Sequence, residues 1–221
     1  MVYDVGMAQG TKQMLSGRVY AELRDAILRG DFAPGDALKP QELAGAHGVS
    51  LAVVREALVR LVGDGLADRL TNRGFAVPLQ SAKRWQDLAE ARSTIEPATL
   101  RMSIARGDLD WEARVRAAHH RLANTPTHEP GTGGVSPQWS EAHRVFHRTL
   151  LEGSGNDVLL ETFDRMWLAG ELTRRWAAGR DPGRDHLAEH RGLEEAALAR
   201  DADAAADLLT RHLTQTAAGL A

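Results

Sequence analysis

The segment from Gln41 to Leu61, QELAGAHGVSLAVVREALVRL, most constrains the fold, because it predicts two short helices joined by a tight turn. Gly48 supplies the turn, since a residue without a Cβ adopts a left-handed backbone most easily. Ser50 stands at the N-cap position of the second helix, whose apolar residues recur at helical spacing. Such a pair of helices is the helix-turn-helix, in which the second helix enters the major groove of DNA. The outer face of that helix carries Arg55.

The residues on either side of this segment extend it to a larger unit. Leu15, Val19, Leu23 and Ile27 recur every four residues and predict a helix that ends at Gly30. Residues 1–14 lack such periodicity and are interpreted as a mobile leader. The runs LADRL and FAVPL flank residues 72–74 and predict a β-hairpin, the wing of a winged helix-turn-helix. The predicted winged unit spans residues 15–78.

Composition limits the partners and the chemistry of the chain. Its 221 residues include no cysteine, which excludes disulfides and thiolate metal ligands, and its formal net charge is −3. Residues 15–80 hold eight Lys or Arg and eight Asp or Glu, so contact with DNA must depend on local charge placement. With no membrane span and no secretory signal, we expect a cytoplasmic protein. All five tryptophans and eight of nine histidines follow residue 80, which suggests two parts with different roles.

After a linker at 79–84, residues 85–221 are predicted to be entirely helical. Apolar periodicity and breaks at glycine, proline and polar residues divide them into six helices, at 84–105, 109–122, 137–153, 156–178, 183–200 and 203–221, the last capped by an aspartate. The predicted fold class is therefore mainly α. It combines an N-terminal winged helix-turn-helix with a C-terminal antiparallel bundle of about six helices.

Four histidines in the predicted bundle form the candidate metal site. His143 and His147 are four residues apart on one helix, and His190 and His212 lie among apolar residues on two others. Neutral imidazole is the commonest protein ligand for zinc, nickel and similar ions, and bundles build metal sites from facing helices. The alternative is that each histidine is a hydrogen-bonded core residue. The adjacent pair His119-His120 is expected to be structural or exposed to solvent.

Residues 15–80, with GDFAPGDAL, the V-R-E-A-L run and NRGFAV, resemble the DNA-binding domain of the GntR superfamily. The resemblance implies that Arg55 reads a base, guanine above all, and that Ser50 and the wing contact phosphate or the minor groove. The chain departs from the family pattern at Gln41, where arginine is usual, and at residues 51–53, where Arg-Thr-Pro is usual. Losing these contacts predicts weak or unusual operator recognition. The alternative is that Arg55 and Arg60 are only solvated charges. The DNA-binding residues expected from the resemblance are Gln41, Ser50, Leu51, Ala52, Arg55, Asn72, Arg73 and Gly74.

The second part resembles the FCD ligand-binding domain of the FadR branch, through LAEARSTIEPATLRMSIA, HRVFHRTLLEGSGN and EHRGLEEAALARDADAAADLLTRHL. The family motif is Asp-x-x-x-His followed by two later histidines. This chain matches the three histidines with His147, His190 and His212 but has His143 at the aspartate position. Four imidazoles favour a borderline divalent metal, with zinc or nickel expected first.

The same resemblance implies a small carboxylate effector beside the metal. Arg92 fits the family's Glu-x-Arg pattern and is the expected cation for the acid. Its alternative is a helix-surface salt bridge with Glu96. Asn156, in the GSGN turn, is expected to cap the next helix or to reach the effector.

The sequence is therefore interpreted as a transcription regulator, expected to be a repressor that binds a palindromic operator as a homodimer. A metal ion and an organic acid would control its binding to DNA. Two alternatives stay open: a metal-dependent enzyme on a helical bundle, and a metal sensor without an organic effector. Four imidazoles around a tetrahedral ion leave no open position for catalysis, which argues against an enzyme.

Overall fold

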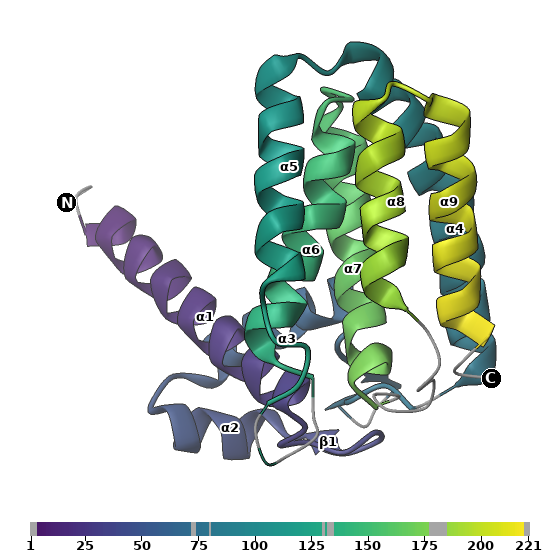
Figure 1. Cartoon of the computed structure of the whole chain (residues 1–221). Helices are drawn as coiled ribbons and strands as arrows, with labels where there is room; N and C mark the ends of the chain where they lie inside the picture. Colours follow the sequence, from purple (N-terminus) through teal and green to yellow (C-terminus); the bar gives the residue numbers. More distant parts are fainter. Residues whose placement is uncertain are drawn as a thin grey trace. The chain divides into compact units, whose positions relative to one another are not determined.

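The computed structural model describes residues 4–71, 74–79, 81–129, 131, 135–176 and 185–218. Contacts within the chain divide it into two compact units, Met1–Gln80 and Ser81–Ala221, which we call the N-terminal and C-terminal units (Figure 1). The mainly helical fold expected from the sequence is confirmed in both.

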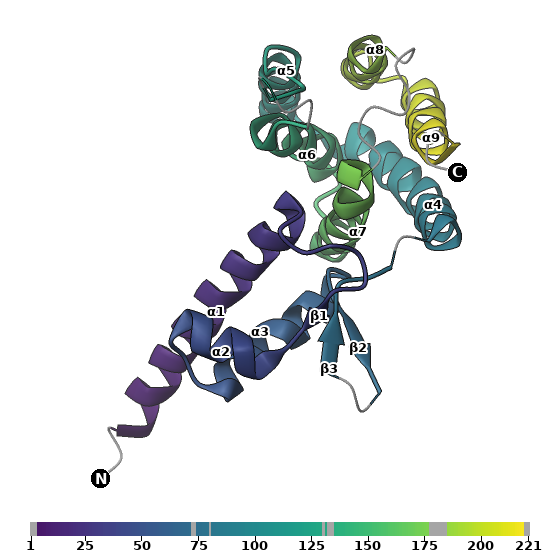
Figure 2. The ribbon, with the colours of Figure 1, turned by 90° about the horizontal axis from the view of Figure 1, so that it is seen from below.

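Three helices form most of the N-terminal unit: α1 (Asp4–Arg29), α2 (Pro40–His47) and α3 (Leu51–Gly63). Helices α1 and α2 both pack against α3, as Figure 2 shows. The periodic residues of α1 from Val19 to Ile27 are buried, as are the apolar residues on one face of α3. Helix α1 begins at Asp4, so it already includes most of the segment predicted to be a leader.

The turn between α2 and α3 has the geometry that the sequence predicts. Gly48 follows α2 with φ of 62° and ψ of 37°, a left-handed conformation that suits glycine. Ser50 is the N-cap of α3, and its hydroxyl accepts a hydrogen bond from the amide of Val53 at 3.4 Å. The turn therefore fixes where α3 begins and which face of it is left outside the core.

A small antiparallel sheet completes this unit, with strand order β1-β3-β2. Strands β2 (Asp68–Leu70) and β3 (Gly74–Ala76) form the predicted hairpin, in which Arg69 pairs with Phe75. Strand β1 (Ala37–Leu38) pairs with the other edge of β3 and was not predicted. Two residues are too few to show an alternating pattern, so the sequence gives no sign of this strand.

Six helices are described in the C-terminal unit, in agreement with the predicted bundle. They are α4 (Ala82–Arg106), α5 (Leu109–Ala123), α6 (Pro137–Glu152), α7 (Asp157–Trp176), α8 (His186–Leu198) and α9 (Ala202–Ala218). Neighbouring helices contact one another in the cyclic order α4, α9, α8, α5, α6, α7 and back to α4, seen nearly end-on in Figure 2. Side chains from all six helices can therefore reach a common interior.

Capping residues explain two helix starts in this unit that differ from the prediction. Helix α4 begins at Ala82, inside the predicted linker, because the Ser81 hydroxyl accepts a hydrogen bond from the Arg84 amide and caps it. Helix α9 begins at Ala202, and its capping aspartate is Asp201, which accepts from the Ala204 amide at 3.0 Å, rather than Asp203.

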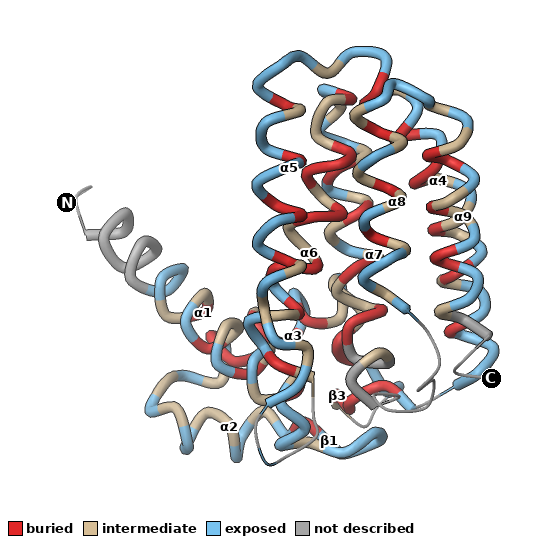
Figure 3. Tube along the Cα trace, viewed as in Figure 1, coloured by how far each residue is buried: buried red, intermediate tan, exposed pale blue. Residues whose placement is uncertain are grey.

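The buried residues of this unit line the inward sides of its helices (Figure 3). Trp111, Phe146 and Phe163 are the largest fully buried side chains, and the Trp111 indole N–H donates to the carbonyl of Thr149 at 2.8 Å. The interior also holds buried polar groups, which collect around one set of histidines.

Candidate metal centre and nucleic-acid interface

The four candidate histidines converge in the interior of the C-terminal unit. Helix α6 carries His143 and His147 one turn apart, α8 carries His190, and α9 carries His212. All four are buried, and each offers a ring nitrogen such that these atoms lie within 4.8 Å of one another. The six distances between ring centroids run from 4.7 to 6.1 Å. We call these four residues the histidine cluster.

The nitrogen positions suit a metal ion. The Nε2 atom of His147 lies 3.1 Å from Nε2 of His143 and 3.3 Å from Nε2 of His190. Ligands about 2.0–2.1 Å from a tetrahedral zinc ion stand about 3.3 Å apart. Three ring nitrogens facing one point cannot all be satisfied by hydrogen bonds to one another, whereas a cation accepts a lone pair from each. The residues present therefore fit a zinc-like ion.

Burial keeps these imidazoles in the form that binds metals. It lowers the pKa values of His143, His147 and His190 well below the usual value, because the charged form loses its solvation. The neighbouring imidazoles add to the lowering at each of the three, since protonating one disfavours protonating the next. At neutral pH these rings are neutral, and each has a lone pair free to coordinate.

His212 of the histidine cluster also forms a hydrogen bond with a carboxylate. The Nδ1 atom of His212 lies 2.7 Å from Oε2 of Glu189, the residue before His190 on α8. This contact leaves Nε2 of His212 as the nitrogen that can face the cluster. The sequence does not predict this contact, since no spacing reports which residues of α8 face α9.

The indole rings of Trp139 on α6 and Trp167 on α7 pack against the ring of His143. The ring of His143 lies 4.5 Å from that of Trp139 and 4.9 Å from that of Trp167, measured between centroids. Two guanidinium groups lie over Trp167 in turn, with Cζ of Arg92 at 5.2 Å and Cζ of Arg174 at 4.3 Å from its centroid. Both guanidinium groups therefore contact Trp167, whose ring in turn contacts His143.

Arg92 forms an ion pair with Glu96, the alternative that the sequence left open, but the pair is buried and not on the helix surface. Its Nε lies 2.5 Å from a Glu96 oxygen, and the side chains are 5% and 1% exposed. The inward face of α4 carries these two charges, while Leu88 and Ile95 on the same helix are only partly buried. Asn156 caps α7, where its Oδ1 accepts from the Leu159 amide at 3.2 Å.

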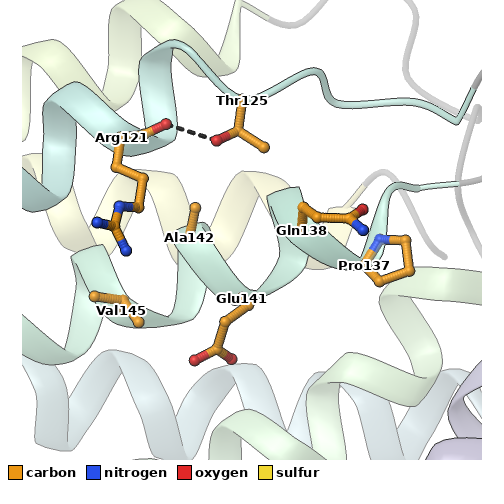
Figure 4. A pocket seen from close by; sticks show the side chains of 7 residues that line it. All are labelled: Arg121, Thr125, Pro137, Gln138, Glu141, Ala142 and Val145. Carbon is orange, nitrogen blue, oxygen red and sulfur yellow. Dashed lines mark hydrogen bonds between the residues drawn. The ribbon is translucent and has the colours of Figure 1, made fainter.

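A separate hollow of about 480 Å³ lies between α5 and α6, and its lining is drawn in Figure 4. The residues that α6 contributes recur at the spacing of one helix face, and that face points away from His143 and His147. The hollow is therefore distinct from the histidine cluster. Its lining residues are Arg121, Thr125, Pro137, Gln138, Glu141, Ala142 and Val145.

His119 and His120 behave as the sequence predicted. His119 is buried, and its Nδ1 pairs with the carboxylate of Glu194 on α8 while its ring packs on Phe146. His120 is exposed. The pair between His119 and Glu194 resembles that between His212 and Glu189, although His119 is outside the cluster.

In the N-terminal unit, the outer face of α3 presents Arg55. Its side chain is exposed and makes no ion pair or hydrogen bond with the described residues. Arg60 differs, because its Cζ lies 4.2 Å from the centroid of the Tyr20 ring on α1. Tyr20 also donates a hydrogen bond of 2.6 Å to Asp64 just after α3. Arg60 therefore takes part in packing α1 on α3, while Arg55 remains available to a partner.

The other predicted DNA-binding residues are distributed around α3 and the hairpin. Ala52 and Gln41 are exposed and Leu51 is half-buried, while Ser50 is engaged as the N-cap of α3. Gly74 opens β3 with φ of 91°. Asn72 and Arg73, in the turn of the wing, lie outside the described residues.

Each of the two units matches a known protein family or domain. Residues 15–77 match the gntR family of bacterial regulatory proteins, and residues 87–215 match the FCD domain. The chain belongs to the GntR family. It is a DNA-binding transcriptional regulator with an FCD domain, which confirms the resemblance inferred from its sequence.

Two relatives of this GntR regulator are HTH-type transcriptional regulators. It is 34% identical over 202 residues to the HTH-type transcriptional regulator BphR of Paraburkholderia xenovorans, covering 88% of this chain and 80% of that protein. It is 30% identical over 199 residues to the HTH-type transcriptional repressor GlaR of Escherichia coli, covering 88% and 90%.

Solved structures agree on the fold. A GntR transcriptional regulator from Rhodococcus sp. RHA1 has a TM-score of 0.74 at 27% identity, covering 93% of this regulator and 96% of that chain. Escherichia coli McbR/YncC has a TM-score of 0.73 at 21% identity over the same shares of the two chains. Within the described part of the chain, every helix is too short or too polar to cross a membrane.

Proposed function

We propose that this regulator binds a palindromic operator as a homodimer and represses transcription until a small organic acid binds beside a metal ion in its C-terminal unit. One observation supports this proposal most: four buried imidazoles from three helices converge in a protein that binds DNA. We propose residues 15–78 as the DNA-binding domain and residues 85–221 as the domain that binds metal and effector. A neutral donor set of four nitrogens favours zinc or nickel.

The proposed contact with DNA depends on Arg55. An exposed guanidinium on the outer face of α3 can donate two hydrogen bonds to guanine in the major groove. Gln41, Leu51 and Ala52, the other residues proposed to contact DNA from α2 and α3, carry no charge. We therefore expect few phosphate contacts and a shallow salt dependence. Ser50 and Gly74, with Asn72 and Arg73 of the wing, are proposed to contact the DNA backbone or the minor groove.

The proposed acid site lies beside the cluster. Four neutral imidazoles leave the charge of a divalent ion uncompensated, so an anion is attracted to it. Arg92 is the proposed cation for the acid, although Glu96 already pairs with it and the acid would have to share its donors. Asn156 uses its carbonyl oxygen as a cap, so only its amide nitrogen is left for an effector.

The proposal is tested by operator binding. An operator is selected from random DNA, and binding is then measured after chelator treatment, after adding zinc, and with zinc plus a panel of small carboxylic acids. We expect one acid to weaken binding at least tenfold only when zinc is present, and His147→Ala to abolish that effect. A response to zinc alone would identify a metal sensor. Turnover of an acid with unchanged DNA binding would identify an enzyme.

A further inference from the structure

Helix α8 provides two adjacent residues that face different neighbours. His190 contributes its imidazole to the histidine cluster, while Glu189 contacts His212 of α9. Neighbouring residues on a helix point about 100° apart, so one can face the interior and the other the next helix. Because α8 and α9 pack side by side, the carboxylate reaches the outer nitrogen of a cluster histidine.

The carboxylate of Glu189 differs from the other groups around the histidine cluster. Among the described residues, no carboxylate forms a hydrogen bond with His143, His147 or His190. The carboxylates nearest the two arginines beside Trp167 are committed to them, Glu96 to Arg92 and Glu171 to Arg174. The Glu189 side chain is 24% exposed, and its partner His212 is 6% exposed, so the contact is largely shielded from water.

A carboxylate on Nδ1 has two consequences for an imidazole. It holds the proton on Nδ1, which leaves the lone pair of Nε2 for the cluster, and it fixes the ring's orientation. It also makes Nε2 a more basic ligand and places a negative charge close to an otherwise neutral donor set. In this chain the second consequence matters more, since all four proposed ligands are neutral.

We propose that Glu189 is a positioning residue for the metal centre, which sets the tautomer of His212 and offsets one of the two positive charges that four imidazoles leave uncompensated. This inference rests on the proposed metal site and assigns a role to a residue outside the ligand set. Removing such an outer carboxylate is expected to weaken metal binding by about 10–100-fold.

The chain offers a matched control on the same helix. Glu194 also pairs with Nδ1 of a buried histidine, His119, but that histidine is not in the cluster. Replacing either glutamate removes one carboxylate–imidazole contact from α8. Replacing Glu189 should weaken metal binding, and replacing Glu194 should not. Both replacements should change the stability of the metal-free protein by a similar amount.

The test measures zinc affinity by competition with a chromophoric chelator for the full-length protein and for Glu189→Ala, Glu189→Gln, Glu194→Ala and His147→Ala. We expect a 10–100-fold loss for Glu189→Ala and a smaller loss for Glu189→Gln, which keeps an acceptor oxygen. Glu194→Ala should stay within about twofold of the parent, and His147→Ala should lose most binding. Circular dichroism checks that each variant is folded.

A second readout covers the case in which Glu189→Ala does not fold. Nitrogen-15 NMR of the zinc-loaded parent reports which ring nitrogen of His212 carries the proton, and we expect Nδ1. A proton on Nε2 would overturn the inference, as would equal zinc affinity for the Glu189 and Glu194 variants while His147→Ala loses binding. If the parent itself binds no zinc, both the metal site and the role of Glu189 are overturned.

Discussion

At the residue scale, burial decides the protonation state of the histidine cluster. His143, His147 and His190 have pKa values lowered by burial, while in the unfolded chain they return to the ordinary value of 6.5. Below pH 6.5 the unfolded chain therefore binds more protons than the native protein. The contribution of these three rings to the stability of the metal-free protein should be fully present above pH 6.5. It should be lost progressively as the pH falls below 6.5 toward their lowered native pKa values.

We predict that the free energy of unfolding of the metal-free protein falls between pH 7.5 and pH 5.5. Each of the three histidines adds a slope of up to about 1.4 kcal/mol per pH unit. Urea unfolding at a series of pH values measures this slope. A flat profile would show that the rings are not buried in neutral form.

A second prediction at this scale separates two arginines of α3. Arg55→Ala should weaken binding to the selected operator by about 10–100-fold and relax base preference at one position, because the proposed bidentate contact with guanine would be lost. Arg60→Ala should mainly lower thermal stability, because Arg60 stacks on Tyr20. Fluorescence anisotropy with the operator and with its substituted forms measures the first effect. Equal loss for all sequences would assign Arg55 to phosphate.

The sequence predicted the four cluster histidines because their types and spacing were visible in it. It could not predict that Glu189 reaches His212, since that contact depends on how α8 packs on α9. It gave Arg92 as the cation for the effector, with a surface salt bridge to Glu96 as the alternative, because two charges at i and i+4 usually form an exposed pair. Here the neighbouring helices cover them.

At the element scale, glycines let helix ends approach one another. A Cβ on Gly153, just after α6, would lie 2.7 Å from both the carbonyl oxygen and the hydroxyl of Ser103 on α4. A carbonyl of a packed helix cannot easily move aside. Gly192 in α8 differs, because a Cβ there would meet only Leu208, at 3.8 Å.

We predict that Gly153→Ala destabilises the protein by about 1–3 kcal/mol, through overpacking of α6 against α4. Gly192→Ala should be neutral or stabilise by up to about 1 kcal/mol, since alanine is the better helix former. Chemical unfolding of both variants at pH 7.5 tests this comparison. Equal stability of the two would contradict the close contact at Gly153.

Long, periodic elements could be predicted from the sequence, and short or context-dependent ones could not. The helices from α4 to α9 were predicted within a few residues, because apolar spacing and glycine or proline breaks mark them. Strand β1 was missed because two residues acquire their conformation only by pairing with β3. The early start of α1 was missed because residues 4–14 have no apolar stripe.

At the scale of the whole molecule, the proposed signal is a coupling between two ligands and DNA. An effector can change operator affinity only if it binds more tightly to one arrangement of the chain than to another. A metal that joins α6, α8 and α9 also stabilises the native C-terminal unit, because the unfolded chain cannot gather these histidines.

We predict that zinc at 100 times its dissociation constant raises the free energy of unfolding by about 2.7 kcal/mol, and that chelation reverses the gain. His147→Ala should abolish the gain, whereas His120→Ala should retain it. Thermal unfolding with and without zinc measures both. Stabilisation that survives His147→Ala would place the bound zinc elsewhere.

The most direct test of the central claim is X-ray absorption at the zinc edge of the protein loaded with one equivalent of zinc. Four imidazole nitrogens at about 2.0–2.1 Å are expected, reduced to three in His143→Ala. A zinc shell with two imidazoles or fewer, or one unchanged in His143→Ala, would contradict a centre built from His143, His147, His190 and His212.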